Sequence, residues 1–246
     1  MCTVFYLKNQ GLLSKNRDKE QPETEEIVAT PEMLGVRTVG ADYLSLGLNR
    51  HGCAFVTTAV NSPTWTAAVE AGELPKAREL MARDIQGKSG ISHLLSRLLP
   101  QVRSIDDWLA AIEKTKTPWR GYNAILVDRN RGVHVEVHAA DHHPSPMGER
   151  YIVTNHFRHL SWGPRHRPDY PNSWERFDYA GEKIQGITSQ EGLFQAIAPA
   201  SPQDRERIWR QDTFQTISST VVDLKALCLY RTFGPGEPFD KIPLPG

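Results

Sequence analysis

The order in which strand-like and helix-like segments alternate along the chain is the feature that most restricts its fold. Short runs of β-branched and aromatic residues between turn residues predict strands throughout the first sixty residues. These strands cover residues 3–7, 12–15, 36–39, 43–48 and 53–60. Apolar residues at helical spacing then predict helices at 74–85, at 91–99 and from residue 105 onward. The last of these helices follows a capping box formed by Ser104 and Asp107.

The second half of the chain repeats this alternation. Strands are predicted at 122–128, 133–138, 151–154, 216–223 and 226–232, and helices from residue 173, at 191–197 and at 204–210. Two helical blocks separated by sheet segments suit helices packed outside two stacked sheets. We therefore expect an α+β fold, a four-layer α/β/β/α sandwich with two mostly antiparallel sheets. No repeat or low-complexity linker interrupts it, so residues 1–246 are expected to form a single domain. The polar segment 19–31, with four glutamates, is expected to be a solvated loop. The Asp-His-His-Pro stretch that begins at residue 141 is also expected to be a solvated loop, and the residues after 236 an irregular tail.

Composition excludes several classes of function. The 29 basic residues balance the 29 acidic ones, and no basic stripe is present, so the charge that drives nucleic-acid binding is missing. No apolar run approaches the roughly 20 residues that span a bilayer, and the amino terminus lacks the pattern of a signal peptide. The 3 cysteines cannot all pair with one another. We expect a reduced, cytoplasmic protein with no membrane and no nucleic-acid partner.

Cys2 offers an unusual chemical possibility at the start of the first predicted strand. Methionine is normally removed when the next side chain is as small as a cysteine, and its removal would leave a thiol and an α-amine on one residue. Reference pKa values are roughly 7.7–8.0 for a terminal amine and about 8.5 for a thiol. One residue could therefore supply both nucleophile and base near neutral pH.

Short motifs that follow Cys2 occur in a consistent order. Lys15-Asn16-Arg17-Asp18 ends the second predicted strand, and a Gly-x-Asn-x-x-Gly stretch at 47–52 is followed by Asn61-Ser62-Pro63. Val153-Thr154-Asn155-His156-Phe157 and Leu229-Tyr230-Arg231-Thr232-Phe233 lie further along the chain. Together these motifs resemble the N-terminal nucleophile (Ntn) hydrolases, in particular the branch that holds penicillin V acylase, choloylglycine hydrolase and isopenicillin-N acyltransferase.

The resemblance implies an amidase site built on Cys2. Cys2 would attack the carbonyl of a small-molecule amide, and Asp18 would hold its α-amine. The backbone N–H of Asn61 and the side chain of Asn155 would stabilise the oxyanion. Arg231 would lie near Cys2 and favour its thiolate, since a nearby cation lowers a thiol pKa. Neither a cofactor nor a metal is expected.

The chain departs from the family pattern at one position of this site. The family has arginine before Asn-x-Asp, whereas this chain has Lys15 there and an arginine at position 17. Lysine supplies charge but lacks the planar donor fork of arginine. Either Lys15 takes that role or Arg17 points away and the site is tuned differently; the register of Asn16 and Asp18 favours Lys15.

Other residue patterns are weaker guides to function. His156 and Phe157 are expected to line the substrate pocket, and the spacing of the histidines matches no zinc template. Hydrolysis of a linear C–N bond is the favoured activity. Three alternatives stay open: acyl transfer to an amine, a non-catalytic Asn-Arg-Asp-Glu type of protein with a trafficking or haem-related role, and a binding scaffold without turnover. The sequence is compatible with a homo-oligomer.

Overall fold

The computed structural model describes residues 2–20, 23–211 and 214–246 and contains two antiparallel sheets. The six-stranded sheet has the order β10-β1-β2-β11-β12-β13 and the seven-stranded sheet has the order β3 to β9. The first sheet comprises β1 (Cys2–Leu7), β2 (Leu12–Lys19), β10 (Arg150–Val153), β11 (Gln215–Asp223), β12 (Cys228–Thr232) and β13 (Asp240–Pro243). The second comprises β3 (Glu25–Ala29), β4 (Met33–Thr38), β5 (Leu46–Asn49), β6 (Ala54–Ala59), β7 (Trp119–Val127), β8 (Gly132–Ala139) and β9 (Asp141–Pro146).

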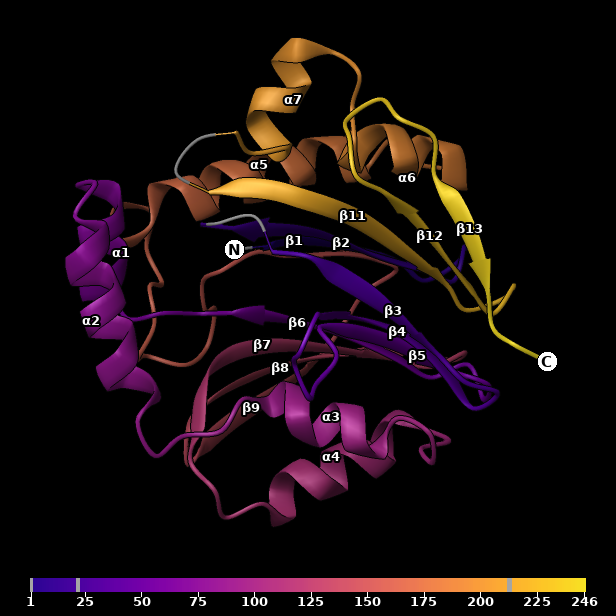
Figure 1. Ribbon diagram of the computed structural model, residues 1–246, viewed down its shortest axis with the longest axis horizontal. Coiled ribbons are helices and arrows are strands. Elements are labelled where there is room, and N and C mark those ends of the chain that lie inside the picture. Colours follow the sequence, from indigo (N-terminus) through magenta and orange to yellow (C-terminus); the bar gives the residue numbers. More distant parts are fainter. Residues whose placement is uncertain (1, 21–22, 212–213) are drawn as a thin grey trace.

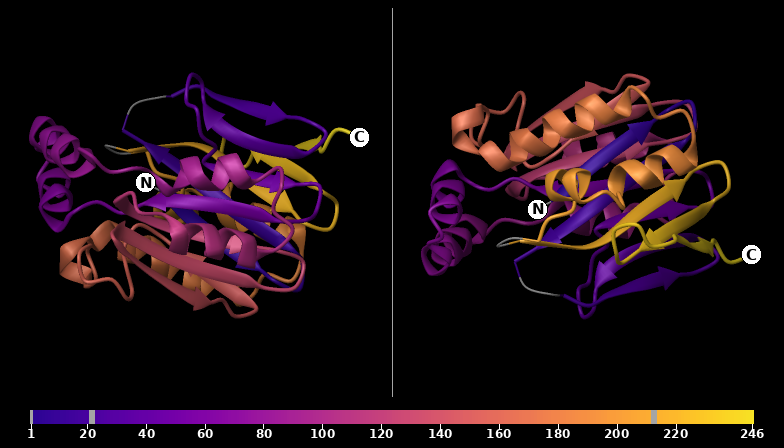
Figure 2. Two further views of the ribbon diagram at one scale, coloured as in Figure 1. Left: turned by 90° about the horizontal axis from the view of Figure 1, so that it is seen from below. Right: turned by 90° about the horizontal axis from the view of Figure 1, so that it is seen from above.

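Helices cover the outer faces of the two stacked sheets, which confirms the four-layer prediction (Figure 1). The helices α5 (Pro171–Ile184), α6 (Gln190–Ile197) and α7 (Pro202–Ile208) lie on the six-stranded side. On the other side, α3 (Ile91–Leu98) and α4 (Ile105–Lys114) cover the seven-stranded sheet. The two further views in Figure 2 show the helical layers from outside, with the sheets behind them.

The two faces of β1 contribute to different hydrophobic cores. Val4 and Tyr6 belong to the core between the sheets, whereas Phe5 and Leu7 belong to the core under α5 and α6. Because side chains alternate along a strand, Cys2 shares the inter-sheet face with Val4 and Tyr6, and Thr3 faces the helices. This alternation fixes the direction in which the Cys2 thiol points.

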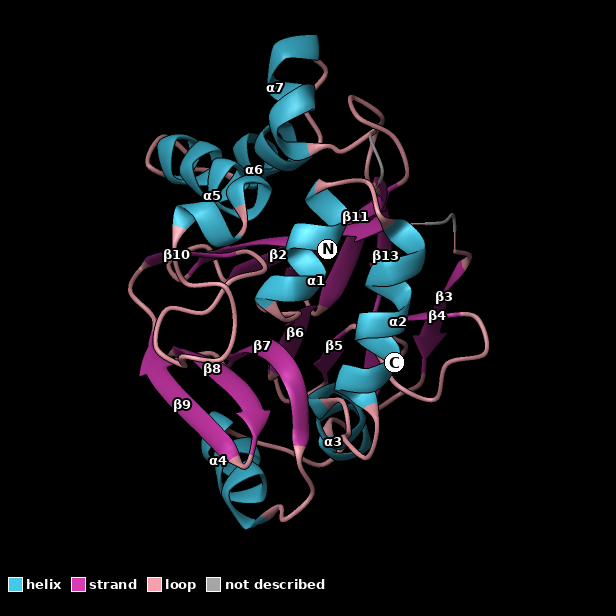
Figure 3. Cartoon of the chain, turned by 90° about the vertical axis from the view of Figure 1, so that its left-hand side faces the viewer, coloured by secondary structure: helices cyan, strands magenta, loops and turns pink. Residues whose placement is uncertain are grey.

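A helical pair stands at the end of the sandwich where β1 begins (Figures 1 and 3). It consists of α1 (Pro63–Glu70) and the predicted helix α2 (Leu74–Ile85). The side chain of Ser62 caps α1 by accepting a hydrogen bond from the Trp65 N–H. Trp65 packs edge-on against Tyr170 and Phe214, so this pair is joined to segments far along the chain.

The structure corrects three expectations for segments predicted to be irregular. The 19–31 segment was predicted to be a loop, but Glu25–Ala29 forms β3, which pairs with β4 along Glu25 to Ala29. The Asp141–Pro146 stretch, predicted to be a solvated loop, is an exposed edge strand paired with β8. The tail adds β13. Pairing with a neighbouring strand supplied the backbone partners that local composition did not predict.

None of the helices within the described residues is long and apolar enough to span a bilayer.

Candidate active site

Strand pairing brings Cys2 and Asn155 together although they lie far apart in the sequence. β10 pairs with β1, with Val153 opposite Val4, so residues just after β10 lie beside the start of β1. The backbone nitrogen of Cys2 donates a 2.8 Å hydrogen bond to Oδ1 of Asn155. Both residues are buried, with Cys2 7% exposed. Cys2 and Asn155 therefore form one pair at the centre of the candidate site.

The Asn155 side chain also connects Cys2 to the segment that contains Asn61. Nδ2 of Asn155 donates to the Ala59 carbonyl at 2.7 Å, two residues before Asn61. The chain here packs closely on β7, because the Val60 N–H donates to the Gly121 carbonyl at 2.9 Å. A Cβ at Gly121 would lie 2.3 Å from the Val60 carbonyl oxygen, so only glycine permits this approach. The Asn155 amide therefore contacts the chain two residues before Asn61, and the oxyanion role of Asn61 stays a prediction.

Asp18 reaches Cys2 through Arg176, a residue that the sequence analysis did not identify. Asp18 is 1% exposed, and its Oδ1 accepts a 2.7 Å hydrogen bond from Thr216 Oγ1. Nη1 of Arg176 lies 3.6 Å from Oδ2 of Asp18 and donates to the Cys2 carbonyl at 2.8 Å. The buried positions of α5 include Ser173, Arg176, Ala180 and Ile184. A charged residue at an inward-facing helical position was the signal that could have revealed it.

Lys15 lies on the inter-sheet face of β2, where it bridges to the seven-stranded sheet. It stands opposite Val4, and its Nζ donates to the carbonyls of Ser45 at 3.2 Å and Thr57 at 2.8 Å. Burial lowers the pKa of Lys15 to about 8, against the opposing influence of nearby Cys2. Lys15 therefore places a titratable positive charge near Cys2.

Arg17 and Arg231 share one buried carboxylate, Glu25 of β3. Arg17 stands opposite Cys2 in the β1–β2 ladder, and both arginines form ion pairs with Glu25. Ser218 Oγ also donates to this carboxylate at 2.6 Å. Although burial acts to raise it, the pKa of Glu25 is held below its ordinary value by Arg17, Ser218 and Arg231. Arg231 was predicted to lie near Cys2 and favour its thiolate; in the structure it pairs with Glu25, a residue that the sequence analysis did not identify.

The residues predicted to bind substrate, His156 and Phe157, lie inside the protein. His156 Nδ1 is 3.0 Å from both Thr154 Oγ1 and Ser173 Oγ, and its ring stacks on Trp174 at 3.9 Å. Burial lowers the pKa of His156 to about 3, so its ring is neutral at physiological pH. Phe157 is 0% exposed. His156 is thus held by hydrogen bonds and ring stacking, and the substrate-binding role predicted for both residues stays a prediction.

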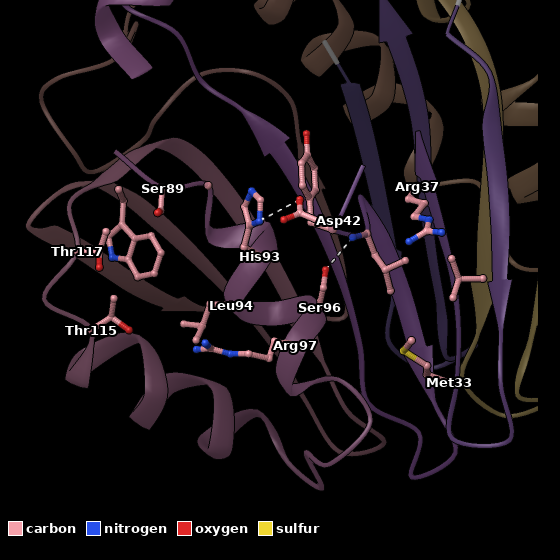
Figure 4. A pocket seen from close by; sticks show the side chains of 15 residues that line it. Met33, Arg37, Asp42, Ser89, His93, Leu94, Ser96, Arg97, Thr115 and Thr117 are labelled. Carbon is pink, nitrogen blue, oxygen red and sulfur yellow. Dashed lines mark hydrogen bonds and ion pairs between the residues drawn. The ribbon is translucent and has the colours of Figure 1, made fainter. Parts of the chain in front are cut away.

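Two cavities of the structure have walls that do not include Cys2. One, of about 540 Å³, is lined by residues of β4, α3 and β7, among them Arg37, Arg97 and Trp119, and by the Asp42–His93 contact of 3.3 Å (Figure 4). The other, of about 640 Å³, lies between α5 and α7, and Arg176 forms part of its wall. Among the described residues, no group of three or more His, Cys, Asp or Glu side chains could hold a metal ion.

Solved structures share this fold, whereas no curated protein sequence gives a significant match. The fold is similar to that of the Caenorhabditis elegans orthologue of N-acylethanolamine-hydrolyzing acid amidase, with a TM-score of 0.59, 11% identity, and coverage of 91% of this chain and 93% of that one. It is also similar to a variant of conjugated bile acid hydrolase from Clostridium perfringens, with a TM-score of 0.59, 12% identity, and coverage of 98% and 92%.

Penicillin V acylase from Agrobacterium tumefaciens gives a TM-score of 0.52 at 13% identity, over 97% of this chain and 84% of that one. These neighbours confirm the predicted Ntn-hydrolase fold. A sequence profile of the acyl-coenzyme A:6-aminopenicillanic acid acyl-transferase family matches residues 44–237. That match spans most of the chain and contains the Asn61, Asn155 and Arg231 motifs. The chain therefore belongs to the acyl-coenzyme A:6-aminopenicillanic acid acyl-transferase family.

Proposed function

We propose that the protein is a cysteine Ntn amidohydrolase that cleaves a linear amide bond in a small molecule after removal of Met1. The observation that carries the proposal is the 2.8 Å contact from the Cys2 nitrogen to Asn155 Oδ1, within a buried cluster of polar and charged groups. Membership of an acyltransferase family supports chemistry at an acyl carbon. The similar structures named for amidase, bile acid hydrolase and acylase activity support an amide as the substrate.

The proposed reaction proceeds through an acyl-enzyme on Cys2. The Cys2 sulfur forms a bond to the carbonyl carbon, and its thiol proton moves to the α-amine, directly or through water. The tetrahedral intermediate then breaks its C–N bond, and the leaving amine takes that proton. Water attacks the resulting thioester, with the α-amine again accepting a proton, and releases the acid and the Cys2 thiol.

Stabilisation of the oxyanion is assigned to Asn61 and Asn155. The Asn155 amide carries two N–H groups, and the contact with the Ala59 carbonyl at 2.7 Å requires one of them. The second N–H, together with the backbone N–H of Asn61, would donate to the oxyanion. Removing such a donor typically raises the barrier by about 2.7–4 kcal/mol. Asp18 would contribute by holding Arg176 in place, and Arg231 by fixing Glu25 beside Arg17.

Intact-mass analysis tests the proposal directly. The purified protein should lack Met1, and brief exposure to penicillin V, a small acyl amide with a reactive β-lactam, should add one covalent adduct. Fragmentation should place that adduct on Cys2. Retention of Met1 in the soluble protein, or an adduct confined to other residues, would contradict the assignment of Cys2 as nucleophile.

Acyl transfer to an amine is a second candidate, favoured by the name of the matched family. It differs from hydrolysis only in the group that resolves the acyl-enzyme. Adding primary amines to a turnover assay separates the two: a hydrolase gives the free acid throughout, whereas a transferase converts the acyl group into the new amide. The expected cytoplasmic location agrees with three free cysteines at positions 2, 53 and 228, and it stays a prediction, as do the single domain and the homo-oligomer.

The low pKa of Lys15 gives a pH-dependent prediction. If its charge assists Cys2, kcat/KM will fall above about pH 8, where Lys15 loses its proton. Lys15→Arg keeps the charge at all relevant pH values, so the decline should disappear or move to higher pH. The half-buried Lys19, at the end of the same strand, serves as the control, and Lys19→Arg should leave the profile unchanged. If kcat/KM declines above pH 8 in the same way for wild type and Lys15→Arg, the reaction does not use this charge.

A further inference from the structure

Arg176 of α5 contacts several parts of the candidate site at once. Nη1 donates to the Cys2 carbonyl at 2.8 Å and to Thr3 Oγ1 at 2.9 Å. Nη2 donates to Asn155 Oδ1 at 3.1 Å. The Arg176 side chain is 2% exposed, so these contacts are largely shielded from bulk solvent. The guanidinium therefore lies at the junction of β1, the end of β10 and α5.

Two further residues, Asn172 and Asp18, hold the guanidinium group of Arg176 in its orientation. Its Nε donates to Asn172 Oδ1, one helical turn earlier, at 3.1 Å. The Asp18 carboxylate lies 3.6 Å from Nη1 and balances the buried charge. A planar guanidinium with partners at Nε, Nη1 and Nη2 has little freedom to rotate. A lysine at this position could supply the charge but not this set of directions.

This arrangement determines which way the Asn155 amide faces. Nη2 of Arg176 and the nitrogen of Cys2 are both donors, and both converge on Asn155 Oδ1. A reversed amide would point its NH₂ group at these two donors, which is repulsive. Nδ2 must therefore face the Ala59 carbonyl and the position where an oxyanion would form. Arg176 also holds the Cys2 carbonyl, so Cys2 is held at both its nitrogen and its carbonyl.

We propose that Arg176 is a positioning residue that orients Cys2 and Asn155 and supplies a fixed positive charge behind the Cys2 amine. The inference rests on the proposed function of Cys2 as a nucleophile. A positive charge beside an amine or a thiol shifts its loss of a proton to lower pH. Arg176 is not a catalytic residue in this scheme, because it acts through Cys2 and Asn155 and not on the substrate.

Other charged and titratable groups also face Cys2 and set the background for this effect. Lys15 and Arg17 project from β2, and Glu25 of β3 pairs with Arg17. Tyr122 of β7 lies close enough to interact electrostatically with Cys2, and burial raises its pKa, so it is neutral near pH 7. Asp18 lies 3.6 Å from the same Nη1 of Arg176 that donates to the Cys2 carbonyl. A change confined to Arg176 leaves these groups in place, so its own contribution can be measured.

The test compares Arg176→Gln, which loses the charge, with Arg176→Lys, which keeps it but loses the fork. The exposed Arg167, ion-paired to Asp178, serves as the control through Arg167→Gln. Two properties are followed against pH: kcat and KM with a small amide substrate, and the rate at which iodoacetamide alkylates Cys2, measured by mass spectrometry. The alkylation assay needs no turnover.

Both Arg176 variants should lose about 10- to 100-fold in kcat with KM nearly unchanged, because the nucleophile is misplaced. The midpoint of the alkylation profile is the pH at which Cys2 reacts with iodoacetamide at half its maximal rate. Only Arg176→Gln should move this midpoint upward, by about one pH unit. Wild-type kcat and an unmoved midpoint in Arg176→Gln would overturn the inference. So would equal midpoint shifts in both variants, since Arg176→Lys keeps the charge. A lower melting temperature with unchanged kcat and midpoint indicates a purely structural role and also overturns it.

Failure of the proposed function gives a different result. If Cys2 is not the nucleophile, wild-type protein forms no acyl adduct on Cys2, whatever the Arg176 variants do. If the function is right and this inference is wrong, wild type and both variants form the adduct at equal rates. If Arg176→Gln does not fold, the kcat of Arg176→Lys still decides the question, since that variant should be impaired with its midpoint in place.

Discussion

Replacing Cys2 with alanine will abolish formation of the acyl-enzyme and lower turnover by about 10⁴-fold or more. Loss of a covalent nucleophile has effects of this order because the remaining groups can only bind and polarise the substrate. The small side chain of alanine fits the site, in which Cys2 is only 7% exposed, so the fold should persist. Turnover and intact mass after exposure to penicillin V are the measurements.

Cys53 provides a matched control for this experiment. It is also buried in the described structure, and burial raises the pKa of its thiol to about 12, which makes it unreactive. Cys53→Ala should keep the acyl adduct and most of the turnover per folded molecule. Residual turnover of the Cys2→Ala protein near the wild-type level would mean that the reaction does not pass through this thiol.

The second large effect is expected from Glu25→Gln, which should destabilise the protein by about 3–5 kcal/mol. The carboxylate is 2% exposed and pairs with both Arg17 and Arg231, so its loss leaves two buried arginines without their common counter-charge. Urea unfolding monitored by fluorescence gives the free energy of unfolding. The neighbouring Glu26 forms a half-exposed pair with Arg37, and Glu26→Gln should cost at most about 1 kcal/mol.

The pH dependence of stability offers an independent check on Glu25. Its folded-state pKa is held below the ordinary value of 4.5, so the stabilisation is complete above that pH. The stabilisation is lost as the pH falls below 4.5 and through the lower folded-state value. The difference between wild type and Glu25→Gln should therefore shrink in acid. A difference that is equally large at pH 3 and pH 7 would show that the charge of Glu25 is not its source.

Local sequence patterns were sufficient to predict the layered fold, and the resemblance to a known family indicated part of the site. Alternating runs such as Cys2–Leu7 and helical spacing as in Leu74–Ile85 depend on neighbours along the chain, and both segments have the predicted type. These two elements follow from short-range periodicity, which a single sequence displays directly. That Asn155 belongs to the same site as Cys2 was expected only from the resemblance to the Ntn hydrolases, and the hydrogen bond between them was not predicted.

Glu25 and Arg176 could not be identified in the same way, because their roles depend on contacts distant in the chain. Glu25 lies in a run of glutamates that suggested solvation, and only the ladder with β4 brings its carboxylate to Arg17 and Arg231. Arg176 is separated from Cys2 by 174 positions. A buried charge is stable only when its partner is present. The residues next to Glu25 and Arg176 in the sequence do not indicate which distant residue that partner is.

The sheet order has a consequence for the timing of maturation. Cys2 is almost fully covered once β1 is paired, and β2 gains its second neighbour, β11, only after nearly the whole chain exists, since Thr216 lies 198 residues beyond Asp18. At about 5–20 residues per second, synthesis of that interval takes roughly 10–40 s. Under the proposed mechanism, removal of Met1 during that interval leaves the Cys2 amine before the fold has closed around Cys2, whereas in the complete fold Cys2 is buried. Synthesis rate and folding rate would then jointly decide what fraction of the molecules becomes active.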